Sequence, residues 1–373
     1  MINVRLKINS IFRIIFMMQT KKHIFFTTSG LFTFVKKDID FLSKEFDMTV
    51  FVFKPQKKWQ TPFLFLKQAL LILKYILKTD IYICKFPGYL SFLPCIVAKV
   101  TRKPCLLITA GTESAGIPSI HYGNFDKKTL GFFTAFSFRW ASHIAPVHKS
   151  LMLQEYHYHP EIYTHQGAGF FCKNLKTPFT EINYGFDPEK FTMGNGVRMI
   201  NSVAIIAAGF ESEVVFLRKG IDLIFEVASK LPNFTFSVIG CEHTQLNRLV
   251  PSNVKLIQKI NQDELILHFQ KHEFYAQLSM FEGFPNALCE AMLCGCIPIG
   301  SSVSAIPDII GNTGFVLEKK NTTDLINLLN RVAQTDKIKL SYEARKKVIN
   351  EYHFSFREQK LRTLIYSLIE NKL

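Results

Sequence analysis

Short apolar runs alternate with longer segments of helical periodicity along most of the chain. In the first half, this pattern predicts strands at 22–30, 48–54, 80–86 and 104–111, separated by helices at 35–46, 63–78 and 89–101. These strands are apolar almost throughout, and a helix follows each of the first three. The pattern therefore predicts a parallel sheet that is covered on both faces.

The same alternation starts again after a turn-rich segment at 183–197. The second series of predicted strands covers 202–209, 234–240, 253–258, 274–279 and 297–302, with helices at 220–231, 263–272 and 286–294. Two such series predict two Rossmann-like lobes, 21–190 and 191–355, with a ligand crevice at the carboxyl ends of the strands. Residues 1–20 precede the first lobe as a basic and apolar extension.

The predicted helix at 63–78 has a wholly apolar face, which consists of Phe63, Leu66, Leu70, Leu73 and Leu77. Three lysines interrupt the segment, so it does not predict a membrane span. We favour packing of this face against a core, and contact with a membrane surface is the alternative.

The charge balance adds a constraint on partners. Lys and Arg number 45 against 30 Asp and Glu, which gives a formal net charge of +15. This excess implies an anionic partner: nucleic acid, an anionic membrane surface or a phosphorylated substrate.

The eight cysteines form no Cys-x-x-Cys pair, and we expect buried, reduced thiols in a reducing cytoplasm. The apolar run within 1–20 is too short to span a bilayer, and an interfacial basic helix and an upstream extension both stay open.

The segment 279–302, SMFEGFPNALCEAMLCGCIPIGSS, carries the most chemical information. Glu282 follows a predicted strand, and Glu290 lies one turn into a helix whose free amides are expected near Asn286 to Leu288. A helix amino terminus binds phosphate through these amides and the helix dipole. Two glutamates beside such an anion site can accept hydrogen bonds from sugar hydroxyls, so this unit contains the parts of a sugar–diphosphate site.

The string EGFPNALCEAMLCGCIPIGS resembles the signature of the family-4 (group 1) retaining glycosyltransferases. Two further segments, NYGFDPEKF at 183–191 and RKGIDLIFEVASKLPNFTFSVIG at 218–240, resemble that family in the same order. The resemblance covers roughly 180–320, and the first lobe agrees only in organisation. It implies an α/β fold of the GT-B type, with a central cleft between two Rossmann-like lobes. It also implies that a C-terminal helix within 356–373 crosses back to the first lobe.

The resemblance implies roles for individual residues. Glu282 would contact the donor sugar and Glu290 the ribose, while Lys219, with Arg218, would neutralise the donor diphosphate. The implied donor site also includes Gly30, Gly283, Phe284, Asn286, Ala287 and Leu288. On the acceptor side, the loop 110–125 has the glycine and serine content of a site loop, and Glu113 and His121 are its candidate residues.

Two positions depart from the family pattern. Where the family usually has an arginine after the glycine that ends the first strand of the second lobe, this chain has Phe210 after Gly209, followed by what we predict to be a long loop. Either Arg218 substitutes for the missing cation, or catalysis is impaired. In the first lobe, Glu113 follows Ala110-Gly111-Thr112 where the family often has a His-Gly-x-Asp-like turn.

We therefore expect a hexosyl-type transferase that moves a sugar, with retention, from a nucleotide-sugar donor to a glycan or lipid-linked acceptor. It would work in the cytoplasm, peripherally on the inner face of the membrane, in cell-surface polysaccharide or glycolipid assembly. The alternatives are a nucleotide-sugar epimerase and a catalytically weak nucleotide-sugar-binding partner of another transferase. No nucleic-acid motif is present, so we expect no nucleic-acid partner.

We expect neither a metal nor another cofactor. Asp38 and Asp40 lie two residues apart on a predicted helix and point about 200° apart, so we expect surface positions rather than a metal site. The histidines His157, His159 and His165 lack cysteines or carboxylates at ligand spacing, and we expect them on the surface as well.

Overall fold

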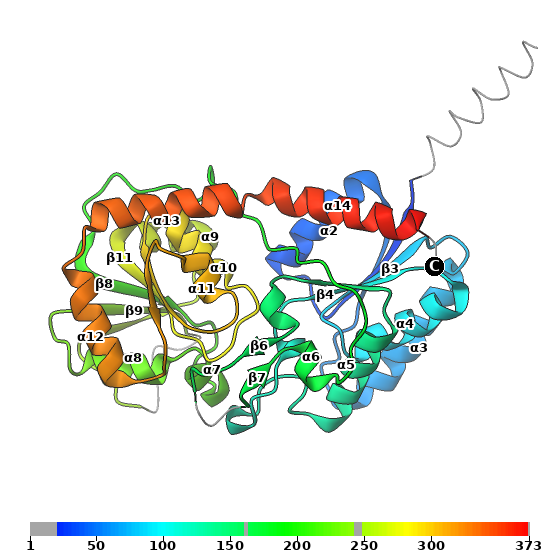
Figure 1. Cartoon of the computed structure of the whole chain (residues 1–373), viewed down its shortest axis with the longest axis horizontal. Coiled ribbons are helices and arrows are strands. Elements are labelled where there is room, and N and C mark those ends of the chain that lie inside the picture. The colour runs from blue at the N-terminus through cyan, green and yellow to red at the C-terminus, as the bar shows by residue number, and fades with distance from the viewer. Residues whose placement is uncertain (1–20, 160–162, 242–247, 372–373) are drawn as a thin grey trace, which may run out of the picture.

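The computed structural model describes residues 21–159, 163–241 and 248–371, so the predicted extension at 1–20 lies outside the described residues. Two lobes lie side by side, each built around a parallel sheet with helices on its faces (Figure 1). The predicted α/β architecture of two Rossmann-like lobes is therefore confirmed.

The first lobe has a five-stranded parallel sheet in the order β2-β1-β3-β4-β5. Its strands are β1 (His23–Thr28), β2 (Asp47–Val52), β3 (Ile81–Lys85), β4 (Cys105–Thr109) and β5 (His143–Pro146). Its helices are α2 (Thr33–Glu45), α3 (Thr61–Tyr75), α4 (Tyr89–Thr101), α5 (Lys128–Trp140) and the short α6 (Ala168–Phe171). Alternate strand residues enter two separate cores, one beneath α3, α4 and α5 and the other beneath α2, as expected for buried parallel strands.

The second lobe has a six-stranded parallel sheet in the order β10-β9-β8-β11-β12-β13. Its strands are β8 (Met199–Ile206), β9 (Thr235–Cys241), β10 (Val254–Gln258), β11 (His272–Gln277), β12 (Ile297–Ser301) and β13 (Phe315–Leu317). Its helices are α7 (Glu213–Arg218), α8 (Ile221–Ala228), α9 (Gln262–Lys271), α10 (Asn286–Leu293), α11 (Ile306–Ile310), α12 (Thr322–Ala333) and α13 (Lys337–Glu351). The short helix α7 occupies the segment that we expected to be a long loop, so that expectation is wrong.

The last helix, α14 (Phe354–Glu370), follows α13 and crosses from the second lobe to the first, as predicted (Figure 1). Its residues Leu361, Ile365 and Ile369 are buried in the core beneath α2. The segment between the lobes runs alongside this crossing: Phe186 N–H donates to the Tyr352 carbonyl at 2.9 Å, and Phe354 N–H donates to the Phe186 carbonyl at 3.1 Å. The two chain crossings are thus held to each other.

Asp38 corrects one expectation, because it is buried instead of lying on the surface. Its Oδ1 accepts from Arg357 Nε of α14 at 2.7 Å, and its Oδ2 accepts from Lys85 Nζ at 2.5 Å and Arg357 Nη2 at 2.8 Å. Burial alone would raise the pKa of this carboxyl, but the two cations outweigh it and lower the pKa to about 2. Asp40, two residues further along α2, is exposed, as expected.

The apolar face of α3 corrects a second expectation, because it points away from the core. Its four large side chains from Phe63 to Leu73 are exposed, as is Leu77 in the turn that follows, whereas Gln68 and Ile72 are buried on the opposite side. The eight cysteines are buried and free, as predicted.

A small antiparallel pair, β6 (Gln154–Glu155) and β7 (His165–Gln166), completes the first lobe near the second. Within the described ranges, no helix combines the length and apolarity needed to cross a membrane. In that same part of the chain, no cluster of three or more His, Cys, Asp or Glu side chains is arranged to hold a metal ion.

Candidate active site

The candidate site lies where the strand order of each sheet reverses. In the second lobe, β8 and β11 are neighbours although β9 and β10 come between them in the chain. Arg218 and Lys219 lie at the end of α7, which follows β8, and Glu282 lies in the loop after β11. Such a switch point is where open parallel sheets bind ligands, because neighbouring loops diverge there.

A cavity of about 240 Å³ lies between the two lobes at this point. Its lining combines groups from both lobes, including Phe34, Ala110, Glu113, Tyr184, Lys219, Gln277, Glu282, Gly283, Phe284, Asn286 and Ala287. The second lobe supplies a cation and a carboxylate, and the first lobe supplies the carboxyl group of Glu113. Most of the residues implied for the diphosphate and sugar thus border one space.

Glu282 is held in a network of donors that all contact Oε1. Lys219 Nζ donates to it at 2.5 Å, Ser279 Oγ at 2.8 Å and Gln277 Nε2 at 3.2 Å. Burial would raise the pKa of Glu282, but Lys219 and Arg218 outweigh it and lower the pKa. The carboxylate is therefore ionised at neutral pH, and its orientation is fixed by its neighbours.

Arg218 reaches the same carboxylate, with Nη1 at 3.5 Å from Glu282 Oε1, and its guanidinium stacks over the Tyr122 ring at 4.9 Å. Phe210, at the usual arginine position, is fully buried in the core of the second lobe. A cation therefore does approach Glu282, but it comes from the end of α7 and not from position 210.

The two lobes touch directly at Gly283. A Cβ atom at this position would lie 1.5 Å from the Ala110 carbonyl oxygen, so only glycine permits this approach. On the other side of the contact, Glu113 is buried, and its Oε1 accepts hydrogen bonds from the backbone N–H groups of Ala110 and Gly111. Burial raises the pKa of Glu113 despite these bonds. The carboxyl group thus fixes the loop that meets Gly283.

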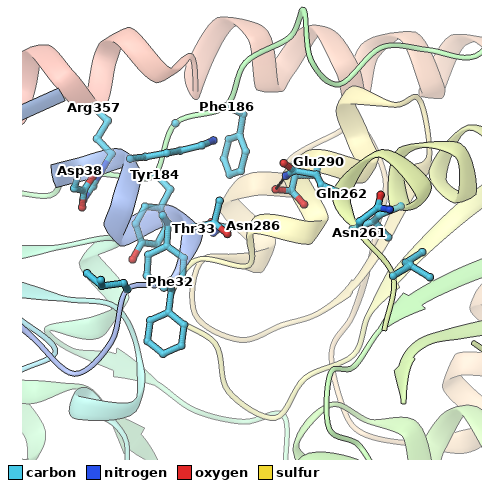
Figure 2. A pocket seen from close by; sticks show the side chains of 16 residues that line it. Phe32, Thr33, Asp38, Tyr184, Phe186, Asn261, Gln262, Asn286, Glu290 and Arg357 are labelled. Carbon is cyan, nitrogen blue, oxygen red and sulfur yellow. Dashed lines mark hydrogen bonds and ion pairs between the residues drawn. The ribbon is translucent and has the colours of Figure 1, made fainter. Parts of the chain in front are cut away.

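A second cavity, of about 540 Å³, continues from the first past Tyr184 and Asn286, which border both. Figure 2 shows Asp38, Arg357 and Tyr184 on one side of it, facing Glu290, Gln262 and Asn261 on the other. This space is lined by α2, by the segment between the lobes and by the starts of α9 and α10. It is large enough for a nucleoside, since ligand pockets begin at about 300 Å³.

Glu290 stands on the wall of this larger cavity. Burial raises its pKa to about 7, although Lys37 and Lys190 pull it back towards the ordinary range. Its hydrogen-bonding environment is sparse, with Gln262 Nε2 at 3.5 Å from Oε1. The carboxyl group is therefore poised to change its protonation near neutral pH.

The start of α10 differs in one detail from the prediction. The Leu288 amide already donates to the Pro285 carbonyl at 3.1 Å, and its side chain is buried in the core, so Leu288 does not line either cavity. Asn286 does line both, and its Oδ1 is buried with no hydrogen-bond partner. Of the three residues predicted at the start of α10, Asn286 and Ala287 thus line a cavity and Leu288 does not.

Two other predicted residues lie apart from the cavities. Gly30 follows β1, and a Cβ there would meet the ring of Phe32, but it is Leu31 and Phe32 that line the larger cavity. His121 is exposed in its loop and lies 3.6 Å from Asp126. The lining of neither cavity includes it.

Sequence reasoning missed several residues of the larger cavity, among them Asp38, Tyr184, Phe186, Gln262 and Arg357. Tyr184 and Phe186 belong to the segment NYGFDPEKF, whose pattern marks the start of the second lobe and does not indicate a cavity. Asp38 and Arg357 carried no signal, because their pairing depends on a crossing that joins the two ends of the chain.

Comparisons with known proteins bear on the second lobe and on the fold. Residues 212–351 match the family described as glycosyl transferases group 1. A stretch of 105 residues is 28% identical to a Campylobacter jejuni protein named N-acetylgalactosamine-N,N'-diacetylbacillosaminyl-diphospho-undecaprenol 4-alpha-N-acetylgalactosaminyltransferase. That match covers 25% of this chain and 29% of the relative.

Solved structures match over nearly the whole chain. Sucrose-phosphate synthase from Thermosynechococcus elongatus has a TM-score of 0.71 at 12% identity, covering 94% of this chain and 100% of that one. Anabaena HepE, solved in complex with UDP and glucose, has a TM-score of 0.66 at 15% identity, covering 93% and 100%. At these identities the similarity establishes the fold.

The molecule is therefore a GT-B protein, with two Rossmann-like lobes and a cleft between them. Its second lobe, over residues 212–351, matches the group 1 glycosyltransferase family.

Proposed function

We propose that this protein is a retaining glycosyltransferase that moves a hexosyl-type sugar from a nucleotide-sugar donor to a glycan or lipid-linked acceptor. The observation that carries the proposal is the placement of Glu282 and Glu290. Both come from one loop and the helix that follows it, yet they border two adjoining cavities of different size. That arrangement suits a ligand with a sugar at one end and a nucleoside at the other.

In this proposal, the nucleoside occupies the larger cavity and the ribose hydroxyls donate to Glu290. The diphosphate lies by the start of α10, near Asn286, and displaces Lys219 from Glu282. Because the other contacts of Glu282 fall on Oε1, its second carboxylate oxygen is the one that meets the sugar hydroxyls. Lys219 and Arg218 then stabilise the charge that grows on the leaving diphosphate.

Support for the substrates comes from the relatives. The Campylobacter protein acts, by its name, on a diphospho-undecaprenol-linked acceptor, and HepE was solved with UDP and glucose. These names favour a nucleotide-sugar donor and a lipid-linked acceptor, in cell-surface polysaccharide or glycolipid assembly. Retention rests on the family resemblance.

The test is calorimetric binding of uridine, guanosine, adenosine and cytidine diphosphates to the wild-type protein. We expect one of the four nucleotides to bind well, and we expect the Glu290→Ala variant to bind that nucleotide more weakly. Glu318→Gln, at an exposed carboxyl in the same lobe, is the matched control and should bind like the wild type. If none of the four nucleotides binds, the proposed donor site is wrong.

Product analysis then separates the alternatives. A transferase releases the free nucleotide only when an acceptor is present, whereas an epimerase converts the donor alone. A catalytically weak partner binds the donor and forms no product with any acceptor. The approach of Arg218 to Glu282 argues for an active enzyme, since it supplies the cation that is missing at Phe210.

A further inference from the structure

The outer side of α3 carries a continuous apolar surface, which we call the α3 stripe: Phe63, Leu66, Leu70, Leu73 and Leu77. These side chains are between 60% and 95% exposed. Their spacing of alternately three and four residues aligns them along one side of the helix and the turn that follows it. Trp59, itself exposed, extends the stripe by packing edge-on against Phe63, with ring centroids 5.9 Å apart.

A stripe of this kind is unusual on a soluble surface. Single exposed leucines are common, but contiguous large apolar side chains along a whole helix mark a surface that contacts something else. The neighbouring helices of the same layer add exposed apolar side chains, namely Val100 of α4 and Phe132 and Trp140 of α5.

The charges around the stripe are mostly positive, although Asp47 of β2 pairs with Lys78 at the end of the stripe. None of the three helices of this layer, α3, α4 and α5, contains an aspartate or a glutamate. Five exposed lysines belong to α3 and the segments at its two ends, namely Lys57, Lys58, Lys67, Lys74 and Lys78. The opposite layer of the lobe does contain acidic residues, for example Asp40 and Glu45 in α2 and Glu358 in α14. The basic excess is therefore concentrated on the side that bears the stripe.

Further cations follow the stripe to its end. Lys103 Nζ donates to the Ile76 carbonyl at 2.6 Å, which ties the end of α4 to the end of α3. A cavity of about 390 Å³ opens there, lined by Lys99, Arg102, Lys103 and Trp140 among others. An apolar stripe thus runs beside basic groups along its whole length.

We propose that the α3 stripe docks on a lipid bilayer that contains anionic lipids, with α3 lying in the plane of the interface. Leucine and phenylalanine side chains would enter the boundary between headgroups and acyl chains, and Trp59 would lie at headgroup level. The lysines would meet the anionic headgroups. Resting on the proposed function, this docking would hold the first lobe against the surface that contains a lipid-linked acceptor.

A second copy of the chain fits this surface less well than a bilayer. Two copies that meet through the stripe would bring lysines against lysines with no carboxylate on these helices to pair with them, and like charges across an interface are unfavourable. An anionic bilayer satisfies both the apolar and the charged parts of the surface.

The test is sedimentation of the full chain with vesicles of phosphatidylcholine alone or with phosphatidylglycerol added. We expect binding to the anionic vesicles that weakens as salt rises, and little binding to the neutral ones. The double variant Leu70→Gln/Leu73→Gln should weaken binding about tenfold or more, because its apolar contact with the acyl region is lost. The matched control is Leu249→Gln/Ile338→Gln, which changes two exposed apolar side chains of the second lobe and should bind like the wild type.

Each other outcome overturns the proposal. If the wild type ignores anionic vesicles at low salt, or if the α3 variant binds them as well as the control does, the stripe is not a membrane surface. If the wild type instead dimerises and the α3 variant is monomeric, a second copy occupies the stripe.

Nucleotide binding in the absence of vesicles keeps this test separate from the proposed function. The exposed α3 variant should bind the nucleotide diphosphate as the wild type does, whatever the vesicles show. If the wild type binds no nucleotide, the proposed function is wrong. The vesicle result would still decide whether the α3 stripe binds a membrane.

Discussion

The proposed contact between Glu290 and the ribose predicts that nucleotide binding depends on pH. Burial raises its pKa to about 7, so the free protein holds a proton there that an ordinary glutamate would have lost. Ribose hydroxyls donate more strongly to a carboxylate than to a carboxylic acid. If Glu290 accepts from the ribose, binding must release this proton, and affinity must rise as the pH rises through 7.

The magnitude follows from the fraction that is ionised. With a pKa of about 7, roughly one molecule in eleven carries the carboxylate at pH 6 and roughly ten in eleven carry it at pH 8. The association constant should therefore rise about tenfold between these two values, which is about 1.4 kcal/mol.

The same shift acts on the stability of the free protein. Because the folded state holds the proton more tightly than the unfolded state, the contribution of Glu290 to the free energy of unfolding falls between pH 4.5 and about 7. A shift of this size is about 3 kcal/mol. Glu290→Gln should remove that loss, so the variant gains stability relative to the wild type as pH rises through this window.

Calorimetry with whichever of the four nucleoside diphosphates binds, at pH 6, 7 and 8 in buffers of different ionisation enthalpy, measures both affinity and proton release. The terminal phosphate of the nucleotide titrates in the same range, so Glu290→Gln supplies the baseline. Glu318→Gln should follow the wild type. If Glu290→Gln shows the same pH dependence as the wild type, the reasoning about Glu290 is refuted.

Three further substitutions test the fold around the site. Asp38→Asn should lower the free energy of unfolding by about 3–5 kcal/mol, because it removes the charge that pairs two buried cations, whereas the exposed Asp40→Asn should change little in chemical denaturation. Gly283→Ala should cost about 1–3 kcal/mol and most of the transfer activity by pushing the lobes apart, while Gly196→Ala, with nothing within 4 Å, should match the wild type in melting temperature and activity. Phe210→Arg should destabilise the second lobe by burying an unpaired guanidinium, and a more active variant of unchanged melting temperature would contradict this.

The sequence predicted the parts of the fold that depend on local pattern. Buried parallel strands are apolar on both faces, so strands such as β1 and β9 were readily found. The prediction that the apolar side of α3 packs against a core was wrong, because a stripe at helical spacing looks the same whether it is buried or exposed. Only the position of the helix in the structure decides between them.

The residues of the candidate site also fall into those that the sequence predicted and those that it did not. Glu282, Glu290 and Lys219 belong to strings long enough to be informative, and the structure brings them to two adjoining cavities. Asp38 was placed on the surface because the angle between neighbouring side chains says nothing of a partner that lies 319 residues away. His121 was chosen for its loop, and the loop turns it outward.

The crossing of α14 has a consequence for how the protein is made. The first lobe is synthesised early, but one of its buried carboxylates and one face of its sheet are completed only by residues near the other end of the chain. Until those residues emerge from the ribosome, Asp38 lacks the ion pair with Arg357. The apolar core beneath α2 also lacks the side chains that α14 contributes. Contacts of such long sequence separation form late, so the first lobe should mature last although its strands come first. A nonsense mutation anywhere after the second lobe would thus damage the opposite half of the molecule.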